Sequence, residues 1–73
     1  MKKQFKIRAN KEFITLSQLL KMESFVQSGG EVRLFLEENP VLVNGEVEIR
    51  RGKKLYPKDI VTIDTIEIEI VGA

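Results

Sequence analysis

The chain has 73 residues, 12 of them basic and 11 acidic, and contains neither cysteine nor histidine. Without these side chains it lacks disulfides, thiolate metal sites and the usual general base near neutral pH. We therefore expect no enzymatic activity, no metal, no cofactor and no small-molecule substrate. The length predicts one small domain, residues 1–73, and the absence of an apolar signal or membrane-spanning run predicts a cytoplasmic protein without a membrane partner.

The charges are unevenly distributed along the chain. Residues 1–11 and residues 50–58 each carry five cations and no acid, whereas residues 59–73 carry four acids and no cation. This distribution predicts an electrically polarised molecule, although the formal net charge is only +1. A basic face of this kind favours a polyanionic partner over a membrane.

A strand and a first helix are predicted at the start of the chain. Residues 3–8 alternate polar and apolar side chains, which is typical of a strand with one solvent-exposed face. Thr15 and Gln18 fit a capping box, so we expect a helix that begins at Leu16 and ends near residue 23 or 24. Its apolar stripe consists of Leu16, Leu19 and Leu20.

A second helix is predicted from about Gly30 to Glu38. Ser28 and Glu31 repeat the capping pattern, and Asn39-Pro40 ends the helix because a residue before proline avoids the α region. We expect the two helices to pack as a hairpin. The buried face of the second helix is predicted to consist of Val32, Phe35 and Leu36.

The second half of the chain predicts four strands. Asn44-Gly45 joins two of them, residues 41–43 and 46–49, because both residues tolerate the positive φ of a type I′ turn. Val47 and Ile49 are expected on one face, with Glu46 and Glu48 on the solvated one. Two further strands, residues 60–63 and the alternating stretch up to Val71, complete an α+β fold in which two short helices pack on a mostly antiparallel sheet of four to five strands.

Two neighbouring glycines, Gly29 and Gly30, leave two interpretations open. Free N–H groups at a helix start carry partial positive charge and bind anionic oxygens, so the pair resembles a phosphate cradle. The alternative is that the glycines only allow a tight connection between the helices. Arg33, one turn further along, favours the first interpretation because it adds a cation nearby.

The densest group of cations follows the predicted hairpin. Four cations in five positions exceed what is needed to keep a sheet edge soluble, and arginine adds bidentate contacts to phosphate. Nucleic acid is therefore the favoured partner. With four phenylalanines and one tyrosine, mostly at apolar positions, the chain has too few exposed aromatics for a base-stacking platform, so folded RNA is favoured over single strands. The four cations are Arg50, Arg51, Lys53 and Lys54.

Residues 14–61 resemble the small RNA-binding domain named after ribosomal protein S-four. The resemblance rests on Thr-Leu-Ser-Gln-Leu-Leu-Lys, Ser-Gly-Gly-Glu-Val-Arg, Val-Leu-Val-Asn-Gly-Glu, Arg-Arg-Gly-Lys-Lys-Leu and Pro-Lys-Asp-Ile-Val, in this order and spacing. It implies an αL-type motif and a non-enzymatic, ribosome-associated protein similar to stand-alone bacterial members, which bind structured RNA, often ribosomal RNA. Carried over by position, the implied RNA-binding residues are Lys21, Ser28, Gly29, Gly30, Arg33, Arg50, Arg51, Lys53 and Lys54.

The chain departs from this family pattern at two places. The typical Arg-Leu-Asp opening is replaced by Thr15-Leu16-Ser17, and the usual Ser-Arg at the second helix start is replaced by Ser28-Gly29. We expect a backbone anion site at Gly29 and Gly30 to substitute for the missing arginine.

Two other classes of protein are compatible with parts of the sequence. Small β-grasp sulfur carriers combine a short helix with a Val-Asn-Gly-Glu hairpin, but they use a C-terminal Gly-Gly, whereas this sequence ends Val-Gly-Ala. A protein-binding adaptor would use the acidic last strand to bind a basic partner. RNA binding remains the leading hypothesis, with RNA contacts predicted on both the second helix start and the segment after the hairpin.

Overall fold

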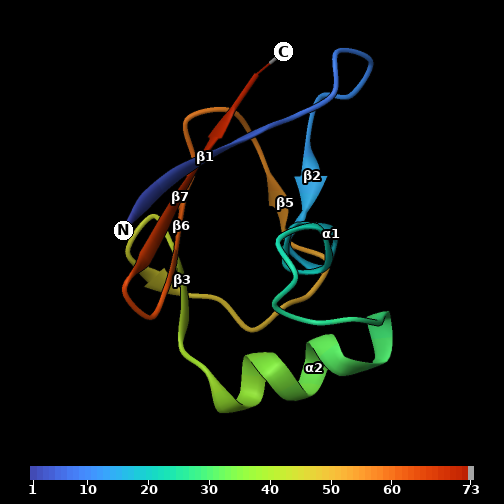
Figure 1. The fold of residues 1–73 in the computed structure, drawn as a ribbon, viewed down its shortest axis with the longest axis vertical. Coiled ribbons are helices and arrows are strands. Elements are labelled where there is room, and N and C mark those ends of the chain that lie inside the picture. Colours follow the sequence, from blue (N-terminus) through green and yellow to red (C-terminus); the bar gives the residue numbers. More distant parts are fainter. Residues whose placement is uncertain (73) are drawn as a thin grey trace.

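This computed structural model describes residues 1–72, which contain two helices and seven short strands. The predicted domain of residues 1–73 also includes Ala73, which lies outside the described residues. None of the helices in the described part has the length and hydropathy needed to cross a membrane. In chain order (Figure 1) the elements are β1 (Lys2–Lys6), β2 (Ile14–Thr15), α1 (Leu16–Met22), α2 (Gly29–Glu38), β3 (Val41–Val43), β4 (Glu46–Val47), β5 (Lys54–Leu55), β6 (Ile60–Ile63) and β7 (Ile66–Val71).

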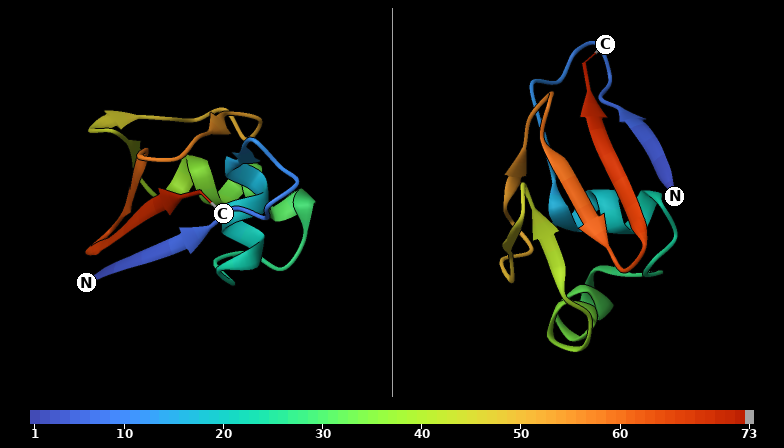
Figure 2. Two further views of the ribbon diagram at one scale, coloured as in Figure 1. Left: turned by 90° about the horizontal axis from the view of Figure 1, so that it is seen from above. Right: turned by 90° about the vertical axis from the view of Figure 1, so that its left-hand side faces the viewer.

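Five strands form one sheet in the order β1-β7-β6-β3-β4, and among the described residues β2 and β5 form a separate two-stranded sheet. β1 runs parallel to β7, while the other neighbours in the large sheet are antiparallel. Both helices lie on one side of the large sheet, as Figure 2 shows. The predicted α+β fold, two helices on a mostly antiparallel sheet, is therefore confirmed.

The core lies between the helices and the inner face of the large sheet. The predicted stripe of α1 is fully buried, and in α2 Val32 and Leu36 are buried while Phe35 is half-buried. Alternate residues of the strands complete this core, as their period of two predicts. The sheet contributes Val41, Val43, Val61, Ile63, Ile68 and Ile70.

The capping box predicted for α1 is confirmed. The N–H of Gln18 donates to Oγ1 of Thr15 at 3.2 Å, and the N–H of Thr15 donates to Oε1 of Gln18 at 3.0 Å. The helix begins at Leu16 as predicted and ends at Met22. After it, Ser24 has a φ of 64°, a left-handed conformation that turns the chain towards α2.

The second helix begins at Gly29, one residue before the predicted start, and ends at Glu38 as predicted. The capping box predicted at Ser28 is wrong, because the Ser28 side chain caps no backbone N–H. Its hydroxyl instead donates to Oε1 of Glu31 at 3.4 Å. In Figure 1, α1 is seen end-on while α2 lies across the view, so the two helices cross steeply rather than packing side by side as a hairpin.

The Asn44-Gly45 turn has the predicted geometry, with φ values of 53° and 86° at its two central residues. The Asn44 side chain also fixes a second turn. Its Nδ2 donates to Oδ1 of Asp59 at 3.0 Å, and its Oδ1 accepts from the N–H of Ile60 at 2.9 Å. Asn44 therefore ties the β3–β4 hairpin to the start of β6.

The strand after this turn differs from its prediction. β4 ends at Val47 instead of residue 49, and beyond it Glu48 is buried while Val47 and Ile49 are 66 % and 71 % exposed. The predicted assignment of faces is therefore wrong. Glu48 turns inwards because its N–H donates to the carbonyl oxygen of Val41 and its carboxylate accepts hydrogen bonds from Arg50.

Candidate nucleic-acid interface

We call residues 50–54 the basic loop. The backbone of this loop is held against the start of α1, and its four cationic side chains project from it. The N–H of Leu16 donates to the carbonyl oxygen of Lys53, and the N–H of Ser17 donates to that of Arg51, both at 2.9 Å. These two N–H groups belong to the first turn of α1, where a helix provides no acceptors of its own. The unpaired N–H groups at the helix start and the carbonyl oxygens of the basic loop therefore satisfy each other's hydrogen-bonding capacity.

A short ladder fixes the end of the basic loop. β5 pairs antiparallel with β2, which places Ile14 opposite Leu55 and Thr15 opposite Lys54. Leu55 is fully buried and anchors the ladder in the core. Within the loop, the N–H of Lys53 donates to the carbonyl oxygen of Arg50 at 3.2 Å, which closes a turn around Gly52. The positions of the four cations are thus set by the fold.

Arg50 is already paired inside the protein. Its Nε and Nη2 donate to the two carboxylate oxygens of Glu48 at 3.0 and 3.1 Å, and its backbone N–H donates to the same carboxylate at 3.0 Å. The side-chain hydrogen bond from Arg50 lowers the pKa of Glu48 to about 2, against the opposing effect of burial. Part of the Arg50 charge is therefore used internally. No carboxylate of residues 1–72 lies within 4.0 Å of the cationic groups of Arg51, Lys53 or Lys54.

The start of α2 offers open backbone donors. A Cβ built on Gly29 would meet nothing within 4 Å, one on Gly30 would meet only the Ser28 hydroxyl at 3.9 Å, and neither glycine has a positive φ. Neither packing nor backbone conformation requires glycine at these positions, which removes the tight-connection interpretation. Within residues 1–72, the N–H groups of both glycines donate to no protein acceptor. An anionic oxygen could therefore approach them without displacing a protein group.

The remaining helix cations have structural partners or roles of their own. Nε of Arg33 lies 3.5 Å from Oε1 of Glu37, one turn later on the exposed side of α2. Lys21 is exposed in the last turn of α1, where a cation complements the helix dipole. The described residues show no hydrogen bond or ion pair between the start of α2 and the basic loop, and α1 lies between α2 and the β2–β5 ladder (Figure 1). Apart from Lys21, which lies on α1 itself, the predicted residues thus form two groups, one on each side of α1.

The fold partly cancels the predicted charge polarity. Because β1 and β7 are neighbours, the basic N-terminal strand lies beside the acidic last strand, with Lys2 opposite Glu67. Nζ of Lys2 is 3.9 Å from the Glu67 carboxylate, and Nζ of Lys3 is 2.6 Å from that of Glu23. Of the two acids of β7, Glu67 therefore faces a cation of the same chain and Glu69 accepts a hydrogen bond from Gln4, which weakens the adaptor hypothesis.

Two aromatic residues near the basic loop were missed by the sequence analysis. The rings of Phe13 and Tyr56 have centroids 5.8 Å apart, and Nζ of Lys54 lies 4.9 Å from the centre of the Phe13 ring. Tyr56 is 44 % exposed and Phe13 is half-buried. The β2–β5 pairing brings them together, and no local pattern connects residues this far apart in the sequence.

The comparison with known families matches this arrangement. A family model described as S4 domain matches residues 5–71. The chain belongs to the S4 domain family. The resemblance seen over residues 14–61 is thereby confirmed, and the match reaches into β1 and β7. This match favours the leading hypothesis over the β-grasp sulfur carrier that the sequence alone left open.

Similar proteins show the same relationship. This S4 domain is 50 % identical over 58 residues to a Bacillus subtilis (strain 168) protein named probable ribosome maturation protein RlbA, covering 80 % of this chain and 82 % of that protein. It also resembles the solution structure of YbcJ from E. coli, with a TM-score of 0.64 and 26 % identity over 93 % of this chain and 85 % of that one. YbcJ is described as having an alfaL motif involved in RNA binding.

Proposed function

We propose that this S4 domain binds structured RNA, either ribosomal RNA or an intermediate of ribosome assembly, and catalyses no reaction. The observation that carries the proposal is the docking of the basic loop on α1, where the carbonyl oxygens of Arg51 and Lys53 accept from the first turn of the helix. Three side chains in this loop make no ion pair with an acid of residues 1–72, and their backbone is hydrogen-bonded to α1. Because the backbone of the loop is already held, binding has to order only the side chains when phosphates replace water.

The start of α2 supplies a second set of phosphate contacts in this proposal. The open N–H groups of Gly29 and Gly30 and the positive end of the helix dipole favour an anionic oxygen. Arg33 adds charge one turn away. With the basic loop on the other side of α1, RNA phosphates would be held at two separated places, which a folded RNA satisfies better than a flexible strand. The name of RlbA supports a ribosome-related target, and the RNA-binding motif described for YbcJ supports RNA as the partner. A ribosome-related target implies a cytoplasmic protein.

Removing two unpaired cations of the basic loop tests the proposal. Arg51→Ala/Lys53→Ala keeps the backbone carbonyls that α1 uses and leaves Lys54 on Phe13. We expect weaker binding to an RNA hairpin and a log–log salt slope that is smaller in magnitude by about 1.5, since each lost phosphate contact contributes roughly 0.7–0.9. Fluorescence anisotropy at several salt concentrations measures both quantities.

The matched control is Lys2→Ala/Lys58→Ala, which removes the same charge from other parts of the surface. It should leave the salt slope unchanged. If both double variants lost the same RNA affinity and salt slope, binding would depend only on net charge. An unchanged slope in the loop variant would contradict the proposed site. A DNA hairpin of the same sequence is the second control, because equal binding of DNA would contradict the assignment to RNA.

A further inference from the structure

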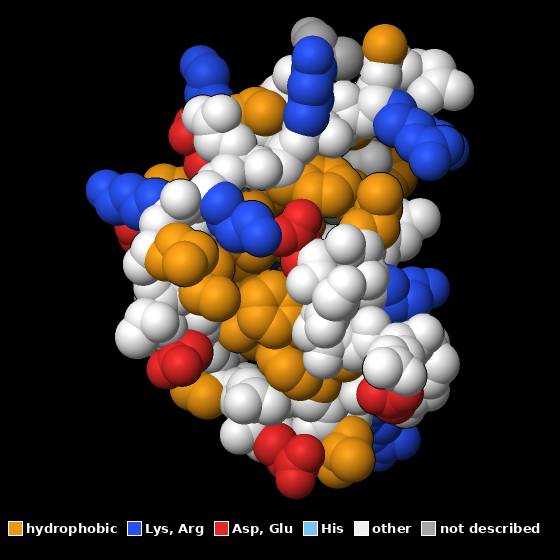
Figure 3. Space-filling view, in the orientation of Figure 1, with side chains coloured by type: hydrophobic (Ala, Val, Ile, Leu, Met, Phe, Trp, Pro, Cys, Tyr) orange, Lys and Arg blue, Asp and Glu red, His pale blue; other side chains and the backbone are white. Residues whose placement is uncertain are grey.

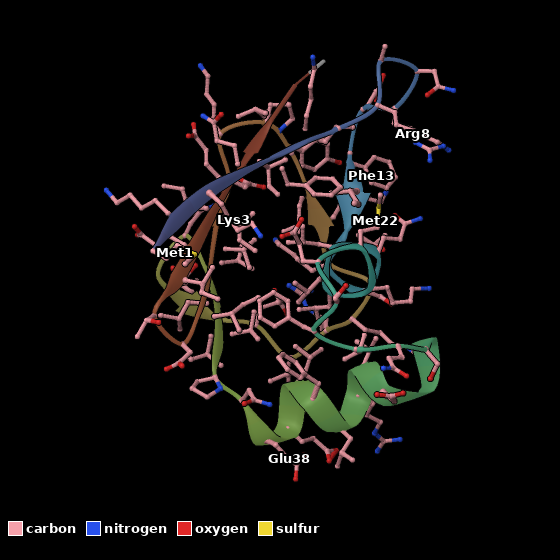
Figure 4. All side chains as sticks on the ribbon, viewed as in Figure 1. Met1, Lys3, Arg8, Phe13, Met22 and Glu38 are labelled. Atoms are coloured by element: carbon pink, nitrogen blue, oxygen red, sulfur yellow. The ribbon has the colours of Figure 1, made fainter. Side chains whose placement is uncertain are left out.

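A hollow of about 630 Å³ lies between the end of β1, the segment that leads into β2 and the outer side of α1. Its floor is largely apolar and includes Phe5, Phe13 and Met22. We call it the N-terminal hollow. Figure 4 shows Phe13 between Arg8 and Met22 in this view. The volume is within the range of sites that take one small organic group.

The aromatic floor is held in place from behind. The Phe13 ring packs against Tyr56 at a 49° angle and lies under Nζ of Lys54, yet Phe13 still lines the hollow. Met22 is 56 % exposed beside it. A flat ring entering the hollow would therefore meet a preordered aromatic side chain and a flexible thioether, both of which pack well against π systems.

The rim of the hollow is strongly basic. Lys6, Arg8, Lys11 and Lys21 line it, with Glu12 as the one acid among the lining residues. None of these four cations lies within 4.0 Å of a carboxylate in residues 1–72. Figure 3 shows Lys and Arg side chains spread around exposed hydrophobic surface on the face seen in Figure 1. An apolar floor with a cationic rim is complementary to a group that combines a flat ring with negative charge, as a nucleotide does.

The hollow continues the basic loop. Lys54 belongs to that loop and also contacts Phe13, while Tyr56 lines a second hollow with Arg50 and Lys53. The β2–β5 ladder joins the two hollows rigidly. A polynucleotide bound along the loop would thus reach the N-terminal hollow without leaving the protein surface.

We propose that the N-terminal hollow receives one unpaired base of a bound RNA, which stacks on Phe13 while Arg8, Lys11 and Lys21 bind the flanking phosphates. The inference rests on the proposed function, since the basic loop must first hold the folded part of the same RNA. It also refines the expectation from the sequence. Too few aromatics are exposed for a platform that binds several bases, but one ordered ring in a basic hollow suffices for one base.

Two RNA hairpins that differ in one nucleotide test the proposal. Both have the same loop; in one the stem is fully paired, and in the other a single unpaired 2-aminopurine is added to the stem. We expect the intact protein to prefer the second hairpin by about fivefold or more, the lower end of what one stacked base contributes. Stacking on Phe13 should also quench the 2-aminopurine fluorescence. Phe13→Leu keeps an apolar side chain and should abolish both the preference and the quenching. The readout is the ratio of the affinities for the two hairpins, because Phe13 also contacts Lys54 of the basic loop.

A second aromatic pair provides the matched control. Phe25 and Phe35 have centroids 5.9 Å apart at 54°, nearly the geometry of the Phe13–Tyr56 pair, and neither lines the hollow. Phe25→Leu should therefore retain the preference and the quenching. Their retention in Phe13→Leu, or their equal loss in Phe25→Leu, would overturn the inference.

The outcomes also separate this inference from the proposed function. Tight but equal binding of both hairpins by the intact protein would overturn the base-binding hollow and leave RNA binding intact. Failure to bind either hairpin would overturn both. If equal binding were accompanied by resonance shifts of Phe13 on addition of an acidic amphipathic peptide, the hollow would be assigned to a protein partner instead, which also overturns the inference.

Discussion

Glu48 is the last acid before the cations of the basic loop. Its side chain is 11 % exposed, and its carboxylate accepts three hydrogen bonds from Arg50, which is itself 73 % exposed. The pair bends the chain between β4 and the basic loop, because the backbone N–H of Arg50 is one of the donors. Glu48 is therefore a positioning residue for the loop, and it reduces the charge that Arg50 presents to RNA.

Glu48→Gln tests this role. We expect the free energy of unfolding to fall by about 1 kcal/mol at pH 7. This value is smaller than that of a buried charged hydrogen bond because Arg50 remains well solvated. The folded-state pKa of about 2 lies below the ordinary 4.5, so the contribution of the carboxylate is complete above pH 4.5 and declines as the pH falls towards 2. Urea titrations of both proteins across this range should therefore show a difference in unfolding free energy that shrinks on acidification.

The neighbouring acid Glu46 provides a control for that measurement. Glu46 is exposed and makes no ion pair within the described residues, so Glu46→Gln should leave stability nearly unchanged at every pH. A difference between wild type and Glu48→Gln that persists unchanged below pH 2 would show that the loss arises from packing, not from the charge.

At the scale of elements, α2 begins with two glycines, although its stability does not depend on the backbone freedom of glycine at either position. Alanine fits both positions and is the better helix former. The double variant Gly29→Ala/Gly30→Ala should therefore have a free energy of unfolding that is higher by up to about 1 kcal/mol, seen as a higher urea midpoint. The added methyl groups would occupy the space through which a phosphate oxygen approaches the N–H groups, so we expect weaker RNA binding together with higher stability.

These two quantities have to be measured on the same double variant. Loss of RNA affinity in a more stable protein excludes unfolding as the cause. Higher stability with unchanged affinity would show that the start of α2 holds no phosphate. The RNA hairpin and the anisotropy assay of the basic-loop experiment serve here as well.

The elements that the sequence predicted correctly carry their information locally. Thr15 and Gln18 form their capping box within one turn, and Asn44-Gly45 determines its own turn conformation. β2 and β5 were missed because each has two residues and exists through pairing across the chain, with Leu55 buried beneath. Glu48 was misplaced because the alternation ends when β4 ends. The cations of the candidate site were predictable as a cluster, whereas the Arg50 pairing and the Phe13 contact depend on tertiary geometry.

For the whole molecule, the position of a charge should matter more than the net charge. β1 and β7 form one edge of the large sheet and β4, from which the basic loop follows, forms the other. β7 lies three strand spacings from β4, about 14 Å, whereas charges are screened over about 8 Å at 0.15 M salt. The repulsion between the acids of β7 and an RNA on the basic loop is therefore largely screened under physiological conditions, although these acids bring the net charge close to zero.

Two single variants with the same net charge test this argument. Glu67→Gln and Glu12→Gln each raise the formal charge from +1 to about +2, but Glu67 lies on β7 near Lys2 while Glu12 lines the N-terminal hollow. At 0.15 M salt, we expect tighter binding of the hairpin with the unpaired base by Glu12→Gln only. At 0.01 M, where screening extends to about 30 Å, both variants should bind more tightly. Identical affinities of the two variants at 0.15 M would mean that the RNA does not pass the N-terminal hollow, since a local charge would then act no differently from a distant one.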